Sequence, residues 1–136
     1  FGAEDYSHSM NCSKSPEALA WARSRLVNAA RCAGVQVSDT VFSRLDDPAA
    51  LLAECQRARD LGFDGKGAIN PNQLPIIHQV FTPDEQELAR AREIVSAAEA
   101  AQAEGIGALS LDGAMVDLPI LLRARRLLDL AMESGQ

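Results

Sequence analysis

The chain opens with Phe1-Gly2-Ala3-Glu4-Asp5, a hydrophobic residue, two small residues and two acids in succession. This order is typical of a buried strand that ends at a site, because small residues let backbone or a ligand approach closely. A carboxylate just past a strand end is well placed to hold a hard cation such as Mg²⁺. Since successive strand residues point to opposite faces, only one of Glu4 and Asp5 can be a direct ligand. A helix or turn cap is the alternative role for Asp5.

Three further acidic positions could carry chemistry. Asp39 follows a predicted strand and either belongs to the site or, as the favoured interpretation, satisfies loop amides. The segment Asp64-Gly65-Lys66 begins another predicted strand, and it favours a structural turn with a surface lysine. Asp117 lies among apolar residues ahead of the last predicted helix, where it is either an N-cap or an active-site acid.

Composition excludes several classes of protein and site. The net charge of -6 leaves no basic stripe for phosphates, so nucleic-acid binding is not expected. Three cysteines without CxxC spacing indicate free thiols in a cytoplasmic protein rather than disulfides or a zinc site. No apolar run approaches the ~20 residues needed to cross a membrane. His8 and His78 have no neighbouring cysteine or acid motif and are interpreted as surface or interface residues.

The elements that must position these residues follow a repeated order of helix, glycine, strand and polar loop. Ser15-Pro16 and Asp47-Pro48 are predicted helix starts, and Gly34 and Gly62 are predicted helix ends. This order is the pattern of βα units and predicts parallel strands with helices outside the sheet. We expect strands near 1–4, 36–42 and 64–69, and helices near 16–33, 48–61, 72–80, 84–104 and 119–132.

Finer features are also predicted from local residue types. Residues 6–14 are polar and predict a loop. In the helix at 16–33, helical spacing predicts a buried face. That face consists of Leu19, Ala22, Leu26, Ala29 and Ala33. Thr82-Pro83-Asp84-Glu85 predicts a capping box with proline at the first helical position. Residues 107–111 predict a short extended piece and Asp112-Gly113 a turn.

Four motifs stand in a fixed order along the chain: Gly2-Ala3-Glu4-Asp5-Tyr6, Leu61-Gly62-Phe63-Asp64-Gly65-Lys66, Ile69-Asn70-Pro71-Asn72-Gln73 and Ser110-Leu111-Asp112-Gly113-Ala114-Met115-Val116-Asp117. Together they closely resemble the citrate lyase beta subunit family, within the HpcH/HpaI aldolase superfamily. Family members are TIM (β/α)8 barrels of roughly twice this length, so the resemblance implies a piece of a longer protein. Residues 1–81 would be the last βα units of the C-terminal half of the barrel, and residues 82–136 a C-terminal helical lid extension.

The resemblance implies a Mg²⁺-dependent lyase that cleaves a carbon–carbon bond in a citryl, citramalyl or malyl thioester. The products would be a keto acid and an acetyl thioester, carried on coenzyme A or an acyl-carrier protein. In the family's pattern Asp5 ligates the metal, backbone amides at Ala3 and Glu4 hold a substrate carboxylate, and Asp117 is the acid/base. A second metal ligand and an arginine would precede this sequence. The alternatives are a malate-synthase-like condensation of acetyl-CoA with a keto acid, and a non-catalytic structural half.

The resemblance also implies a homotrimer in which the segment with Asp117 crosses to the next barrel. Gly105, Gly107 and Gly113 would give that segment the backbone freedom of a lid. Ala114 stands where a lysine is common in the family, and Lys14 stands where an arginine often precedes the Ser-Pro turn. These departures leave the identity of the acyl group open.

Overall fold

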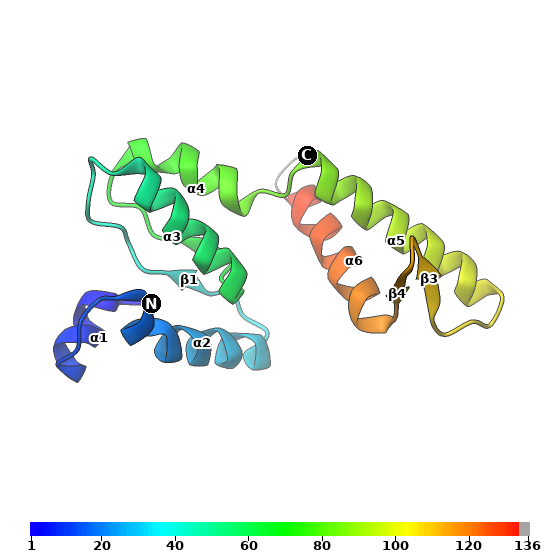
Figure 1. The fold of residues 1–136 in the computed structure, drawn as a ribbon, viewed down its shortest axis with the longest axis horizontal. Helices are drawn as coiled ribbons and strands as arrows, with labels where there is room; N and C mark the ends of the chain where they lie inside the picture. Colours follow the sequence, from blue (N-terminus) through cyan, green and yellow to red (C-terminus); the bar gives the residue numbers. More distant parts are fainter. Residues whose placement is uncertain (134–136) are drawn as a thin grey trace. The chain divides into compact units, whose positions relative to one another are not determined.

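The computed structural model describes residues 1–133, a mixed α/β chain that divides into two compact units, Phe1–Phe81 and Thr82–Gln136 (Figure 1). Among the described residues, no helix is long and apolar enough to cross a membrane. The first unit contains α1 (Ala3–Met10), α2 (Pro16–Ala33), β1 (Ser38–Asp39), α3 (Pro48–Leu61), β2 (Gly65–Lys66), the 3-10 turn η1 (Pro71–Gln73) and α4 (Leu74–Phe81). The second unit contains α5 (Glu85–Ala103), β3 (Leu109–Leu111), β4 (Ala114–Val116) and α6 (Leu118–Glu133).

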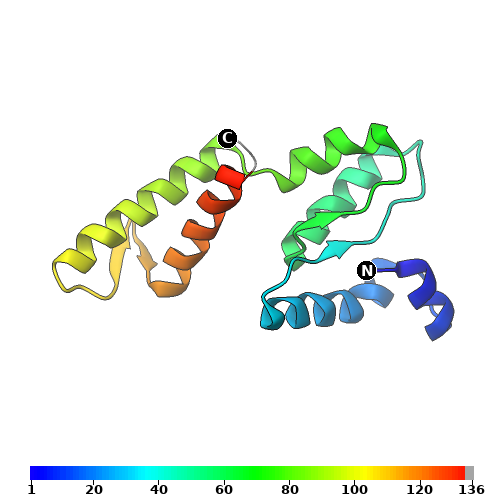
Figure 2. The same cartoon turned by 180° about the vertical axis from the view of Figure 1, so that it is seen from behind.

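The sheet of the first unit is a parallel pair in which Ser38 lies opposite Gly65 and Asp39 opposite Lys66 (Figure 2). Parallel pairing between the second and third predicted strands is therefore confirmed. Both strands are shorter than the predicted ranges 36–42 and 64–69. Each strand has a single neighbour in the described chain, so regular pairing is limited to the residues where the two strands face each other.

Two hydrophobic clusters hold the helices of the first unit against the strands, and α3 contributes to both. The first cluster consists of Val27, Ala30, Val37, Ala58 and Phe63. The second consists of Phe42, Leu51, Cys55, Ile77 and Val80. Since α3 places Ala58 in one cluster and Cys55 in the other, it connects the layer with α2 to the layer with α4.

The helix boundaries of α2 and α3 confirm the predicted starts and ends. The Ser15 hydroxyl accepts a hydrogen bond from the Ala18 N–H, and Asp47 accepts one from the Ala50 N–H. Both helices end at a glycine in the left-handed region, Gly34 at φ 67° and Gly62 at φ 95°. These positions favour glycine because a Cβ atom is strained there.

The predicted buried face of α2 is partly wrong. The buried residues are Leu19, Arg23, Val27 and Ala30, and Leu26 is 36% exposed. The face of α2 that carries Arg23 lies towards the strands, where Arg23 binds Asp39. The spacing of apolar residues alone does not predict such a charged partner.

The predicted strand at 1–4 is wrong and the predicted loop at 6–14 is wrong as far as Met10, because Ala3–Met10 is the helix α1. Glu4 and Asp5 lie in the first turn of α1, where acidic side chains are stabilised by the positive end of the helix dipole. Asn11 ends the helix in the left-handed region at φ 49°, and its N–H donates to the carbonyl of His8. Only the start of the segment runs beside β1, where the Phe1 nitrogen donates to the Ser38 carbonyl at 2.7 Å.

The second unit is a helical hairpin in which α5 packs against α6, with the antiparallel strands β3 and β4 between them in sequence. Asp112 and Gly113 form the strand turn at φ 52° and 79°, so the predicted turn is confirmed. No strand was predicted at residues 114–116, but they pair with 109–111 as a second strand. The capping box of α5 lies at Asp84 and Glu87, two residues later than predicted, because these two side chains exchange hydrogen bonds with each other's backbone.

Candidate functional site

Asp5 presents an exposed carboxylate at the first turn of α1. No side chain or backbone group of the described residues forms an ion pair or hydrogen bond with this carboxylate. A Cβ atom added at Gly2 would lie 3.3 Å from Asp5 Oδ2, tighter than ordinary contact. The missing side chain at Gly2 therefore leaves the space that the Asp5 carboxylate occupies.

The neighbouring acid, Glu4, forms an ion pair with Lys14 at 2.6 Å. The Ala3 N–H donates to the hydroxyl oxygen of Thr40 at 3.3 Å, whereas the Glu4 N–H has no acceptor among the described residues. The start of α1 therefore offers an unpaired carboxylate at Asp5 and an unpaired backbone N–H at Glu4.

A hard cation such as Mg²⁺ prefers oxygen ligands and is often held by one or two carboxylates together with waters and substrate oxygens. Asp5 fits the role of one such ligand, since its oxygens are exposed and without a protein partner. Within residues 1–133 there is no group of three or more His, Cys, Asp or Glu side chains that could hold a metal ion. The assignment of Asp5 as a magnesium ligand therefore remains a prediction.

Asp117 lies just ahead of α6 in the second unit. Its carbonyl accepts from the Leu121 N–H at 3.0 Å, and its Oδ1 atom accepts from the Ile120 N–H at 3.4 Å. This is the geometry of an N-cap, one of the two roles that the sequence allowed. The second carboxylate oxygen has no partner among the described residues, so capping leaves it available for proton transfer.

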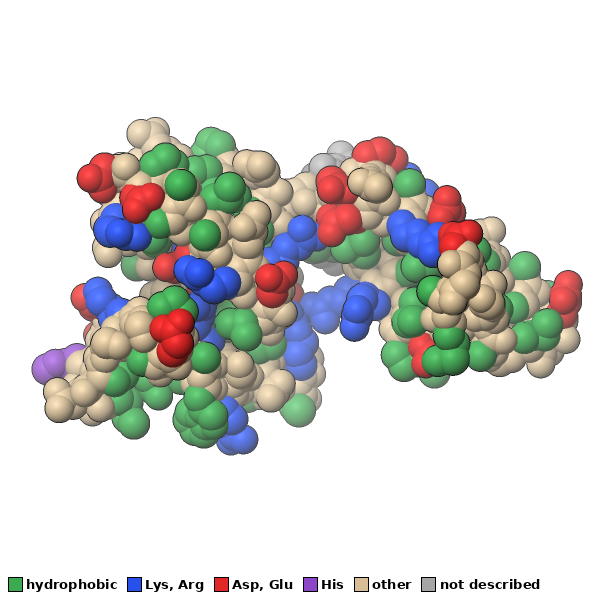
Figure 3. All heavy atoms as spheres, viewed as in Figure 1, with side chains coloured by type: hydrophobic (Ala, Val, Ile, Leu, Met, Phe, Trp, Pro, Cys, Tyr) green, Lys and Arg blue, Asp and Glu red, His purple; other side chains and the backbone are tan. Residues whose placement is uncertain are grey.

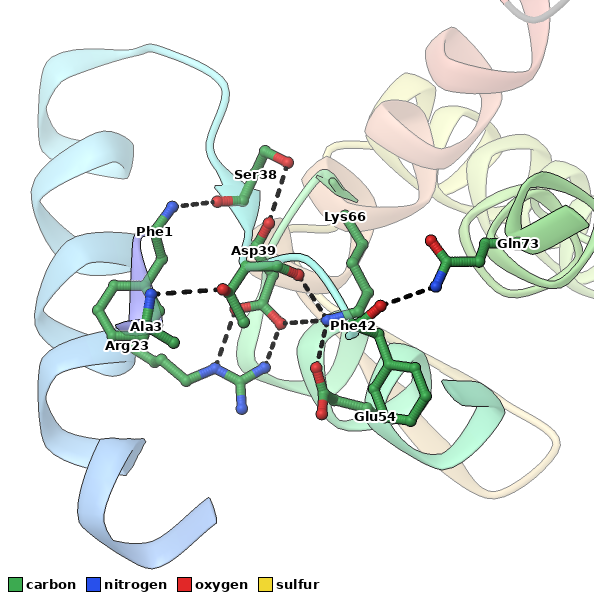
Figure 4. Close-up of polar contacts among 10 residues, drawn as sticks. Phe1, Ala3, Arg23, Ser38, Asp39, Phe42, Glu54, Lys66 and Gln73 are labelled. Carbon is green, nitrogen blue, oxygen red and sulfur yellow. Dashed lines mark hydrogen bonds and ion pairs between the residues drawn. The ribbon is translucent and has the colours of Figure 1, made fainter. Parts of the chain in front are cut away.

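A buried cluster of four charged side chains lies between the strands and the helices of the first unit (Figure 4). Arg23 donates to both carboxylate oxygens of Asp39, with Nε to Oδ1 at 3.0 Å. Lys66 Nζ lies 3.3 Å from Asp39 Oδ2 and also pairs with Glu54. Two positive and two negative charges thus balance within the cluster, as buried charges require.

This cluster corrects two sequence interpretations. Lys66 is not a surface residue, because its side chain is 0% exposed. Asp39 does not satisfy loop amides, because its carboxylate, also 0% exposed, binds the Arg23 and Lys66 side chains. Local sequence patterns favoured loop or turn roles for Asp39 and Lys66. The partners of Asp39 are instead Arg23 and Lys66, which lie 16 and 27 residues away in sequence.

Arg23 and Glu54 were not singled out in the sequence. The available signal for Arg23 was its spacing of four residues from both Leu19 and Val27, which places it in the apolar stripe of α2. A charged residue within such a stripe indicates a buried partner. Glu54 precedes Cys55 on α3, and no pattern in the sequence marks it as a partner of Lys66. In the structure its side chain is 24% exposed.

Cys55 is fully buried beside this cluster. Burial raises the pKa of the Cys55 thiol, and the positive charge of Lys66 partly opposes that shift. Among the described residues, all three cysteines are free thiols, as predicted. His8 and His78 are exposed, in agreement with their interpretation as surface residues.

A pocket of about 480 Å³ adjoins the start of α1 in the first unit. Its lining includes Ala3, Glu4, Arg23, Thr40 and Arg57. The pocket thus places two of the three predicted site residues of α1 against the end of β1.

On the face shown in Figure 3, acidic and basic side chains are interspersed over the first unit.

A family model described as HpcH/HpaI aldolase/citrate lyase matches residues 1–71, which include α1, both strands of the parallel pair and the buried cluster. The chain belongs to the HpcH/HpaI aldolase/citrate lyase family. Citrate lyase subunit beta of Escherichia coli (strain K12) is 46% identical over 136 residues, covering 98% of this chain and 45% of the relative. Mitochondrial citramalyl-CoA lyase of Homo sapiens is 34% identical over 133 residues, covering 96% of this chain and 39% of the relative.

The fold of this HpcH/HpaI family chain also matches a solved structure. The crystal structure of CitE from Mycobacterium tuberculosis, in complex with magnesium, acetoacetate and coenzyme A, superposes with a TM-score of 0.79 at 29% identity. That alignment covers 96% of this chain and 50% of the other. The chain thus spans about half the length of the relatives it matches.

Proposed function

We propose that this chain belongs to a Mg²⁺-dependent carbon–carbon lyase that cleaves a 3-hydroxy acyl thioester of citryl, citramalyl or malyl type. The products would be a keto acid and an acetyl thioester. The observation that carries the proposal is the unpaired Asp5 carboxylate at the start of α1, in a chain 46% identical to a citrate lyase subunit beta. Magnesium, acetoacetate and coenzyme A in the CitE complex are the metal, a keto acid and a thioester carrier that such a reaction needs.

In this proposal Asp5 is the ligand that the chain contributes to the metal. Magnesium bound there would polarise an oxygen of the departing keto acid. The free Glu4 N–H would donate to a substrate carboxylate, in line with the expected role of this turn. Ala3 would act differently from expectation, since its N–H already donates to Thr40 and is free for substrate only if that bond opens.

Asp117 is the proposed acid/base. Cleavage requires the 3-hydroxyl of the substrate to lose its proton, which would pass to water, and it leaves a thioester enolate. The α-carbon of that enolate must gain a proton to give the acetyl thioester. A carboxylic acid at Asp117 would supply this proton, and the carboxylate would remove it in the reverse condensation. The Ile120 N–H fixes one oxygen of Asp117 and leaves the other for this transfer.

For the whole protein we propose a TIM (β/α)8 barrel of which residues 1–81 are the last βα units, with residues 82–136 as a helical lid extension. The parallel pairing of β1 with β2 and their alternation with α2, α3 and α4 support the barrel assignment. A homotrimer acting on a coenzyme A or acyl-carrier thioester is the proposed assembly and substrate carrier.

The test is an assay of the complete protein with Mg²⁺ and citryl-, citramalyl- and malyl-CoA. We expect turnover of at least one thioester, and Asp5→Asn should reduce both turnover and Mg²⁺ affinity by at least about tenfold, because a neutral amide binds a hard cation weakly. Asp60→Asn, an exposed acid at the end of α3, is the matched control and should leave both unchanged.

A folded protein that turns over no thioester in either direction would overturn the lyase proposal and favour the structural role. Turnover only in the direction of condensation, from acetyl-CoA and a keto acid, would favour the malate-synthase-like alternative. Unchanged Mg²⁺ affinity in Asp5→Asn would remove Asp5 from the metal site.

A further inference from the structure

The start of α1 lacks the cap that most helices carry. The residue at its N-cap position is Gly2, which has no side chain, and no side-chain cap bond is formed from that position. The first N–H groups of a helix have no partner within the helix and need an acceptor from elsewhere. For the Ala3 N–H, the acceptor is the hydroxyl of Thr40, 37 residues away in sequence.

Thr40 is itself held from β2 on both sides of its peptide. The Gly67 N–H donates to the carbonyl of Asp39 at 3.1 Å, immediately before Thr40. The Lys66 ammonium donates to the carbonyl of Thr40 at 2.6 Å. The end of β1 is therefore fixed against β2 at the residue whose hydroxyl reaches α1.

The buried charge cluster in turn fixes Lys66 (Figure 4). Its ammonium lies between Asp39 and Glu54, and Asp39 is held by two hydrogen bonds from Arg23 on α2. A lysine with three fixed acceptors cannot reorient without leaving buried charges unpaired. The position of the Thr40 hydroxyl is thus set by α2, α3 and β2 together.

We infer that Thr40 is a positioning residue for Asp5: its hydroxyl caps α1 from the end of β1 and thereby orients the first turn that carries the metal carboxylate. The inference rests on the proposed function, because it assigns Asp5 to the metal. It also gives a role to Lys66 in the Leu61–Lys66 motif. Lys66 holds the carbonyl of Thr40 and so affects Asp5 indirectly, without contact to substrate.

The test replaces the hydroxyl with a methyl group of the same shape, Thr40→Val, in the complete protein. Two properties are measured: amide hydrogen exchange of residues 3–6 without metal, and Mn²⁺ affinity by electron paramagnetic resonance. We expect faster exchange in α1 and an Mn²⁺ Kd raised about fivefold, as befits the loss of one hydrogen bond. Thr40→Ser keeps the hydroxyl and should restore both properties towards those of the unmodified protein.

Ser15→Ala is the matched control for a merely structural effect. The Ser15 hydroxyl also accepts one backbone N–H, from Ala18 at 3.2 Å, but it caps α2 instead of α1. This variant should lower the melting temperature while leaving the Mn²⁺ Kd and the exchange of residues 3–6 unchanged.

The outcomes separate this inference from the proposed function. If Thr40→Val binds Mn²⁺ like the unmodified protein, or if Thr40→Ser shows the same loss, Thr40 does not position Asp5. If Ser15→Ala weakens Mn²⁺ binding equally, the effect is one of general stability and the inference is overturned. If the unmodified protein binds no Mn²⁺ at all, the metal assignment fails and the inference fails with it, whatever the exchange rates are.

Discussion

At the scale of single residues, the first unit keeps a neutral set of charges in its interior. Arg23, Asp39 and Lys66 have side chains that are at most 5% exposed, and each charge has an opposite charge within hydrogen-bonding distance. Removing one member of a buried ion pair costs about 3–5 kcal/mol, whereas an exposed pair is worth about 1 kcal/mol or less. Removal of the Lys66 side chain should therefore cost far more stability than removal of Lys14, whose pair with Glu4 is exposed.

Cys55 gives the first unit a predictable response to alkaline pH. Burial raises the pKa of its thiol, so above the ordinary pKa of a thiol the folded chain binds more protons than the unfolded chain. By linkage, the stabilising contribution is complete below that ordinary pKa and is lost as pH rises through the raised one. We expect the free energy of unfolding to fall in this range with a slope of up to about 1.4 kcal/mol per pH unit from this group.

Chemical denaturation between pH 7 and pH 10 measures this slope. Cys55→Ala should lower stability at every pH because it opens a cavity, but it should make the alkaline slope shallower. The exposed Cys32 is the matched control, and Cys32→Ala should leave the slope unchanged. Equal slopes in the unmodified protein and in Cys55→Ala would contradict the prediction.

At the scale of elements, most helices were predictable because their ends are marked by local chemistry. Ser15, Asp47 and the glycines that follow α2 and α3 fix boundaries through contacts within a few residues. The helix α1 was missed because its cap is Thr40, a residue distant in sequence. The strand β4 was missed because a strand of three residues is defined by its partner, although the turn at Asp112-Gly113 that joins the two strands was predicted.

The turn between β3 and β4 should be sensitive to a side chain at one glycine and not at another. Gly113 has φ 79°, where an added Cβ is strained whatever the surrounding space. Gly113→Ala should therefore destabilise the second unit by roughly 1–2 kcal/mol. Gly107 has no atom within 4 Å of an added Cβ and no positive φ, so Gly107→Ala should be neutral or stabilise by up to about 1 kcal/mol.

Urea denaturation of the complete protein, followed by a probe in the second unit, measures both changes. A loss of stability that is the same at Gly107 and Gly113 would show that backbone conformation is not the cause.

At the scale of the whole molecule, each unit carries one of the proposed functional acids, Asp5 in the first and Asp117 in the second. Each acid was proposed from local features, Asp5 from its motif at a predicted strand end and Asp117 from its motif ahead of a predicted helix. The arrangement that supports Asp5 could not be found in this way. Asp39, Glu54 and Lys66 meet only when strands and helices far apart in sequence have packed, and no short pattern distinguishes a buried lysine from a surface one.

We predict that Asp117 acts in the active site of a neighbouring subunit. Mixed oligomers of Asp5→Asn and Asp117→Asn subunits should then regain activity that neither variant has alone. In a closed cyclic trimer with random equal mixing, about a quarter of the sites would receive both intact acids, so activity should approach about a quarter of that of the unmodified protein.

The measurement is thioester turnover after subunit exchange, with exchange itself verified by mass spectrometry of the mixed oligomers. If both acids of one site come from the same subunit, every site in the mixture lacks one of them. Verified exchange without recovery would therefore assign Asp117 to its own subunit.

The neutral cluster of Arg23, Asp39, Glu54 and Lys66 also has an evolutionary consequence. A single substitution that removes a charge at any of these positions leaves the cluster with a net charge, whereas a paired exchange to apolar residues can be neutral or stabilising. Among descendants of one ancestral sequence, these positions should therefore change together or not at all. Lys66 and its two acidic partners should show this covariation most strongly, because the ammonium of Lys66 pairs with both carboxylates.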